Sequence, residues 1–225
     1  MFLLIIVFII TGLVVQKRLK SKFKKYSKEA LLNGLSGAEI AEKMLNDHGI
    51  HDVRIESVAG KLTDHYNPAN KTVNLSPEVY GGRSISAAAV AAHEVGHAVQ
   101  HATGYKWLEM RSQLVPIAQL SGKIMNIVLW SMILGMSFLK IFDMNTVIWI
   151  LIAAQAAITF VSIVTLPVEY DASNRALLWL TSSGTVTEPE HDKAKDALTW
   201  AARTYLVAAL ASLTQLAYYF SLLRD

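Results

Sequence analysis

The stretch AAHEVGHAVQH, residues 91–101, places three histidines and a glutamate in one predicted helix. His93 and His97 are one helical turn apart, so their imidazoles face the same way and can bind one cation. Glu94 points beside that cation, where a carboxylate can act as a general base. This H-E-x-x-H spacing is typical of zinc hydrolases. The alternative is a pair of histidines that are hydrogen-bonded on a partly buried helix face.

A catalytic zinc ion also needs a third protein ligand. Glu169, in TLPVEYDASNRAL, follows a hydrophobic segment, and we expect Pro167 to open a new helix there from which the carboxylate reaches the histidine pair. His101 is a weaker candidate because it lies about 12 Å from His93 along the helix axis, too far for both to bind one ion. The alternative for Glu169 is an acidic residue that only stabilises the first turn of a helix.

The composition indicates a membrane protein, because 52% of the 225 residues are hydrophobic and only 17% are charged. Four uncharged stretches approach the length of about 20 residues that a membrane-spanning helix needs. We therefore predict a mainly α membrane protein with four transmembrane helices and a small cytoplasmic α+β region. The predicted division is a transmembrane anchor at 1–16, a cytoplasmic region at 17–113, two transmembrane helices at 114–166, a cytoplasmic segment at 167–204 and a last transmembrane helix at 205–225.

A basic run fixes the predicted orientation. Seven basic residues lie between Lys17 and Lys28, directly after the first apolar stretch, and the positive-inside rule places such a run in the cytoplasm. A cleaved signal peptide would carry its charge before the apolar stretch, and a nucleic-acid-binding tract need not adjoin a span. Lys123 and Arg203 are expected at the cytoplasmic ends of their spans. The predicted location is the cell membrane, with several spans, the H-E-x-x-H helix in the cytoplasm and both termini outside.

The sequence of the predicted cytoplasmic region indicates several short helices and strands. SGAEIAEKMLNDHG predicts a capped helix, DVRIESV a strand, and the turn NPAN a hairpin that ends in a strand at residues 71–75. A short helix is expected after Ser76, followed by an alanine-rich helix that carries the motif and ends near Gly104. We expect a substrate chain to add to an open edge of the strand at 71–75.

Three separated motifs carry a family resemblance: HEVGHAVQ after an alanine-rich lead, DHYNPANKTVNLSPEVYGGRSI, and PVEYDASNRAL between hydrophobic spans. Together the motifs resemble the membrane-bound neutral zinc metallopeptidases of the YugP type, over nearly the whole chain. The resemblance implies a zincin-like fold and a gluzincin-like site, with Glu94 as catalytic base and His93, His97 and Glu169 as ligands of one Zn²⁺ per chain. In the wider gluzincin group an aspartate often follows the ligand glutamate by four positions, whereas this chain has Ser173 there and Asp171 two positions earlier.

The predicted function is therefore a zinc-dependent metalloendopeptidase that hydrolyses polypeptides, membrane proteins among them, on the cytoplasmic side of the bilayer. No nucleic-acid partner is expected. The alternative is a non-catalytic zinc-binding scaffold or quality-control factor, which would have no use for an unligated Glu94. The sequence does not choose among the side chains that could stabilise the oxyanion, which are His65, Tyr170, Arg175 and His191.

The orientation is testable with reporter fusions. A reporter joined after Ser183 is expected in the cytoplasm and one at the carboxyl terminus outside, because one predicted span separates the two positions. Accessibility of the two reporters in intact cells measures their sides. Both reporters on the same side would contradict the four-span topology.

Overall fold

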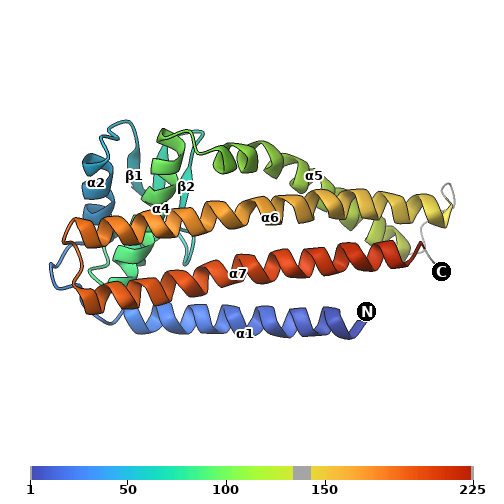
Figure 1. The fold of residues 1–225 in the computed structure, drawn as a ribbon, viewed down its shortest axis with the longest axis horizontal. Coiled ribbons are helices and arrows are strands. Elements are labelled where there is room, and N and C mark those ends of the chain that lie inside the picture. The colour runs from blue at the N-terminus through green and yellow to red at the C-terminus, as the bar shows by residue number, and fades with distance from the viewer. Residues whose placement is uncertain (1, 134–142, 224–225) are drawn as a thin grey trace.

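The computed structural model describes residues 2–133 and 143–223 of the chain. Four long helices run alongside one another: α1 (Phe2–Tyr26), α5 (Lys106–Ile133), α6 (Met144–Ser182) and α7 (Glu188–Ser221). Contacts join α1 to α7, α7 to α6 and α6 to α5 (Figure 1). The chain is mostly helical, and a small mixed region lies at one end of the long helices.

The small region contains most of the elements predicted between the first two spans. Its helices are α2 (Gly37–Asp47), α3 (Pro77–Tyr80) and α4 (Ile85–Ala102), and its strands are β1 (Arg54–Ser57), β2 (His65–Asn67) and β3 (Thr72–Leu75). The capping box at the start of α2 is confirmed, because Ser36 accepts from the backbone N–H of Glu39 while the Glu39 side chain accepts from that of Ser36.

The strand order corrects one expectation. The sheet has the order β1-β3-β2, with β3 parallel to β1 and antiparallel to β2. The strand predicted at residues 71–75 is therefore central and has no open edge, and all four residues of β3 are buried. The hairpin pairing of β2 with β3 is confirmed. On the other side of β3, β1 pairs in parallel with all of residues 72–75 and so covers that edge. The strand with an edge beside α4 is β2.

Pro167 does not open a new helix, contrary to the prediction. It lies inside α6, which continues through it to Ser182. Proline removes one helical hydrogen bond, but packing around it favours continuity: Val164 and Val168 are buried, and the hydroxyl of Tyr105 donates to the Pro167 carbonyl at 3.4 Å. Glu169 is therefore held on a rigid helix interior and not in a first turn.

Among the described residues, two helical segments are long and apolar enough to cross a membrane, Lys106–Met132 in α5 and Met144–Ser182 in α6. Lys123 lies within the first segment, and its predicted place at a cytoplasmic end remains a prediction. Spans in α1 and α7 remain predictions, and the second predicted span extends into residues 134–142, outside the described part. The predicted boundaries near 16, 113, 166 and 204 all fall inside long helices, so these helices continue from the predicted spans into the small region.

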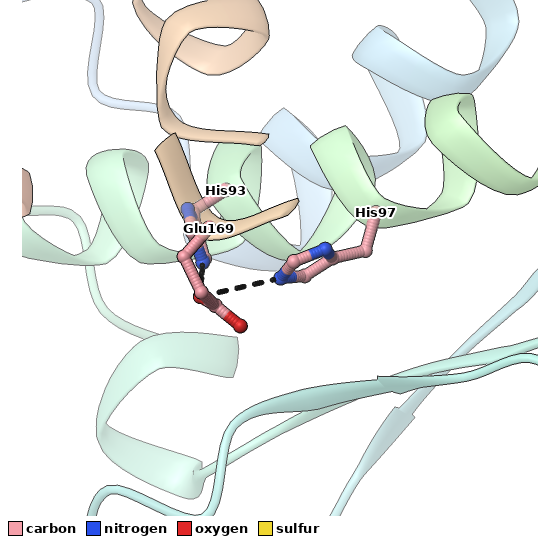
Figure 2. A group of neighbouring side chains, drawn as sticks. All are labelled: His93, His97 and Glu169. Carbon is pink, nitrogen blue, oxygen red and sulfur yellow. Dashed lines mark ion pairs between the residues drawn. The ribbon is translucent and has the colours of Figure 1, made fainter. Parts of the chain in front are cut away.

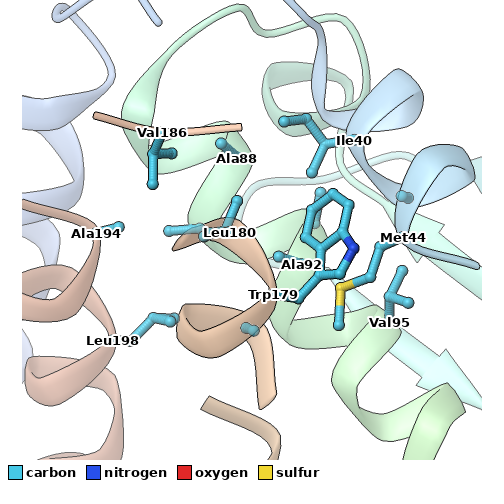
Figure 3. Packing of buried hydrophobic residues seen from close by; sticks show 14 of the residues in the cluster. Ile40, Met44, Ala88, Ala92, Val95, Trp179, Leu180, Val186, Ala194 and Leu198 are labelled. Carbon is cyan, nitrogen blue, oxygen red and sulfur yellow. The ribbon is translucent and has the colours of Figure 1, made fainter. Parts of the chain in front are cut away.

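A buried apolar cluster joins the small region to the long helices. Figure 3 shows α2, α4, α6 and the start of α7 meeting around Met44, Val95, Trp179 and Leu180. The indole N–H of Trp179 donates to the Asp47 carboxylate at 3.0 Å, which ties α6 to the end of α2. Alanines dominate the face of α4 in this cluster, and small side chains allow close helix packing.

The helix α4 comes very close to the backbone of α6 at Gly96. A Cβ atom at this position would lie 2.6 Å from the carbonyl oxygen of Ala172, so only glycine fits unless a backbone moves. The glycine within H-E-V-G-H thereby sets the distance between the helix that carries the histidines and the helix that carries Glu169.

Gly96→Ala is expected to destabilise the protein by about 1–3 kcal/mol, because the added methyl group pushes α4 from α6. The matched control is Gly122→Ala in α5, where nothing lies within 4 Å of the new Cβ, and its effect should stay within about 1 kcal/mol. Unfolding of the purified protein in detergent and its zinc content measure both effects. Equal stability and zinc content for the two variants would contradict the assignment.

Candidate metal centre

Three side chains converge between α4 and α6. The Nε2 atom of His93 lies 3.3 Å from Oε2 of Glu169, and Nε2 of His97 lies 3.7 Å from the same oxygen. Figure 2 shows both rings of α4 directed at this carboxylate of α6. One donor atom from each residue falls within 4.8 Å of the others, so one cation could contact all three. The structure brings together all three residues that the sequence predicts as metal ligands.

The cluster suits a zinc ion. The Oε2 atom of Glu169 is buried and has no hydrogen-bond partner among the described residues, although it belongs to a carboxylate that needs one. Two imidazole nitrogens and one carboxylate oxygen form the donor set of many catalytic zinc sites. A divalent cation between the three residues would satisfy the buried oxygen and relieve the cost of burying its charge.

Each histidine is oriented through its other ring nitrogen. Ser173 Oγ lies 3.1 Å from Nδ1 of His93, and Oε1 of Gln100 lies 3.0 Å from Nδ1 of His97. These contacts leave both Nε2 atoms directed at Glu169, and such partners commonly fix the orientation of metal-binding histidines. Ser173 thus contacts a histidine from the position where the resemblance leads one to expect an aspartate.

Asp171 reaches the cluster through Gln100. Its carboxylate accepts from Nε2 of Gln100 at 2.8 Å and from Nε of Arg175 at 2.5 Å, and Gln100 in turn contacts His97. Gln100 was not among the site residues predicted from the sequence. The sequence feature that could have indicated Gln100 is its position three residues after His97, which puts both side chains on one face of α4.

The electrostatics favour an ionised carboxylate. Nη1 of Arg111 in α5 donates to Oε1 of Glu169 at 2.9 Å, a contact that the sequence analysis also missed. Burial favours the neutral form of His97, but the carboxylates of Glu169 and Glu94 outweigh that effect and raise the pKa of His97 above its ordinary value. A cation must displace this proton, so we expect metal binding to weaken as the pH falls.

Glu94 lies beside the cluster and outside the group of potential ligands. Its side chain is buried, and Oε2 accepts from the backbone N–H of Tyr66 in β2 at 3.0 Å. This bond holds the carboxylate against the strand edge that borders the site. The placement matches a general base, which must be near the reacting water without binding the metal itself.

A pocket of about 380 Å³ opens onto the cluster and Glu94. Of the four candidate oxyanion donors, His65 lines this pocket, whereas Tyr170, Arg175 and His191 do not. Arg175 is engaged by Asp171, and His191 lines a separate hollow between α6 and α7. Tyr205 of α7 and Arg111 also line the pocket. Neither residue was predicted from the sequence, because nothing near them in the chain indicates a site.

His101 lies outside the cluster, as its spacing predicted. Its Nδ1 atom is 2.7 Å from the hydroxyl of Tyr66. Burial, followed by the nearby charge of Asp52, raises the pKa of Tyr66 to about 12, so the phenol that contacts the imidazole stays protonated. His101 therefore supports β2, the strand whose backbone holds Glu94.

Metal analysis can separate the two candidate third ligands. Glu169→Ala is expected to lower zinc occupancy sharply because it removes one of three donors, whereas His101→Ala should leave the bound zinc nearly unchanged. Zinc per chain is measured on the purified variants. Full occupancy in Glu169→Ala together with loss in His101→Ala would reverse the assignment.

Comparisons with known proteins show which family the chain resembles. The family model described as "Putative neutral zinc metallopeptidase" matches residues 1–224. The "Putative membrane protease YugP" of Bacillus subtilis (strain 168) is 42% identical over 202 residues, which cover 89% of this chain and 86% of the relative. No solved structure matches the chain. A family match over nearly the whole length, with a histidine pair and a glutamate gathered at one point, leads to one conclusion: the chain belongs to the neutral zinc metallopeptidase family.

Proposed function

We propose that this protein is a multi-pass membrane metalloendopeptidase that binds one zinc ion through His93, His97 and Glu169. The observation that carries the proposal is the buried Oε2 of Glu169, which has no hydrogen-bond partner among the described residues and faces Nε2 of both histidines. An ionised carboxylate in such a position is costly unless a cation shares the site.

Zinc bound there would supply Lewis acidity, which acidifies a water molecule and polarises a peptide carbonyl. The residues of the chain transfer the protons and donate hydrogen bonds. Glu94 takes a proton from the attacking water and later delivers it to the leaving amine, while the N–H of Tyr66 keeps its carboxylate in place. The pocket side chains that can donate to the developing oxyanion include His65, Arg111 and Tyr205.

The edge of β2 is the proposed place for the substrate backbone. This strand pairs with β3 on one side, and its other side borders α4 and the pocket, which Asp64, His65 and Tyr66 help to line. An extended peptide can add to such an edge through main-chain hydrogen bonds, which hold many sequences in the same geometry. The peptide bond opposite Tyr66 would then lie next to Glu94.

A non-catalytic zinc scaffold accounts less well for these contacts. A structural zinc site is closed by a fourth protein ligand, and the cluster in the described part of the chain offers three. Glu94 would have no purpose in a scaffold, although it is buried beside the cluster and fixed by a backbone N–H. We place the site on the cytoplasmic side because the basic run at the end of α1 adjoins the small region.

Glu94→Gln is expected to keep zinc and fold normally while hydrolysis falls about 100- to 10,000-fold, because the variant keeps the ligands and loses only proton transfer. Glutamine still accepts from Tyr66 through its carbonyl oxygen. Casein hydrolysis and zinc content of the purified full-length protein measure the two effects. Hydrolysis near the wild-type rate would remove Glu94 from the mechanism, and no zinc-dependent hydrolysis by the wild type would overturn the proposed function.

A further inference from the structure

The pocket that contains the cluster continues along one face of α5. Leu108, Ser112, Val115 and Gln119 line it, and their spacing of three or four residues places them on a single side of the helix. From Leu108 to Gln119 this wall extends about 16 Å, at about 1.5 Å per residue. The pocket is therefore elongated, with the edge of β2 at one end and Gln119 of α5 at the other.

The exposed surface becomes apolar at the same level as the pocket. Pro116 lines the pocket and the next residue, Ile117, is 52% exposed, whereas Tyr205 lines it from α7 and is followed by exposed Leu206. Further exposed apolar side chains continue away from the small region, namely Leu120, Ile124 and Ile127 on α5 and Leu210 and Leu213 on α7. In a membrane these side chains face lipid, so the pocket crosses the boundary between water and the apolar phase.

Two of the long helices, α5 and α7, line the pocket at that boundary. Both α5 and α7 pack against α6, which carries Glu169, and in Figure 1 they lie on opposite sides of it near the small region, whereas α5 crosses α6 farther along. Within the described residues they share an apolar cluster around Val128 and Tyr219, far from the site, whereas near the small region both contribute side chains to the pocket. A chain segment between α5 and α7 would therefore reach Glu169 directly.

The wall of α5 also offers a backbone acceptor. Pro116 has no N–H, so the carbonyl of Ser112, four residues earlier, lacks its helical hydrogen-bond donor. Ser112 lines the pocket. Unpaired backbone groups are costly in apolar surroundings, and an extended chain that enters the apolar phase needs such partners. A carbonyl next to an apolar wall suits the backbone of a chain at the point where it leaves the bilayer.

We propose that the substrates are membrane-anchored polypeptides, cut at a peptide bond close to the point where the chain emerges from the bilayer. The apolar flank of the cleaved bond lies between α5 and α7, and the polar flank adds to the edge of β2. This inference rests on the proposed function and names its substrate class. A soluble chain can still enter from the side of β2, but it gains nothing from the apolar end of the pocket.

The test uses full-length zinc-loaded protein in phosphatidylcholine vesicles. The substrates carry an apolar helix of about 20 residues followed by a repeated cleavable sequence, whose length increases from about 5 to about 20 residues and so adds up to about 50 Å. Mass spectrometry locates the cuts. We expect them to stay within the first few residues after the apolar helix at every length. Cuts spread evenly along the longer substrates would overturn the inference.

Variants of α5 test the apolar end of the pocket. In Val115→Trp the larger side chain fills part of the pocket and should reduce cleavage of the anchored substrate at least about 10-fold more than cleavage of casein. The matched control is Leu120→Trp, which lies on the exposed apolar surface outside the pocket and should leave the ratio of the two rates unchanged. Equal ratios for both variants would also overturn the inference.

Casein separates the two proposals. If the wild type hydrolyses casein, Glu94→Gln does not, and the anchored substrates show no preference for bonds near the membrane, the substrate class is wrong and the proposed function stands. If the wild type hydrolyses neither casein nor the anchored substrates, the proposed function itself fails and the substrate class fails with it.

Discussion

The close packing of α4 against α6 at Gly96 is the constraint on which the site depends. A methyl group there would meet the carbonyl of Ala172 at 2.6 Å, so the glycine sets how near the two backbones come. Glu169 and Ser173 lie on either side of Ala172 along α6, and each contacts a histidine of α4. A wider separation would carry the carboxylate and the hydroxyl away from the imidazoles together. The small residue inside H-E-V-G-H is therefore part of the site's geometry.

The Glu169 carboxylate is buried between closely packed helices, where protein groups must replace the hydrogen bonds of water. Arg111 of α5 pairs with one oxygen of Glu169, and the other oxygen faces the two histidines. Asp171 and Gln100 extend the polar network to His97, and Gln100 is fully buried with all its partners in place. The network joins α4, α5 and α6, so we expect loss of metal to loosen the contacts among these helices as well as to remove activity.

The long helices that contain the predicted membrane spans also carry residues of the site. Glu169 and Tyr205 lie on helices that continue into apolar, exposed segments, and Arg111 lies within the segment of α5 that is long and apolar enough to cross a bilayer. The small region supplies the histidines, the base and the strand edge. The site is assembled where these two parts meet, because neither part alone carries all of the groups.

The sequence by itself determined the features that local chemistry controls. Helical spacing of His93 and His97, the capping box at Ser36 and the hairpin around NPAN depend on residues a few positions apart, and the structure has each of them. Tertiary structure alone decided that β3 is central, that α6 continues through Pro167, and that Gln100, Arg111 and Tyr205 border the cluster. These features depend on contacts between distant segments, where burial outweighs the local preference of a proline or a strand.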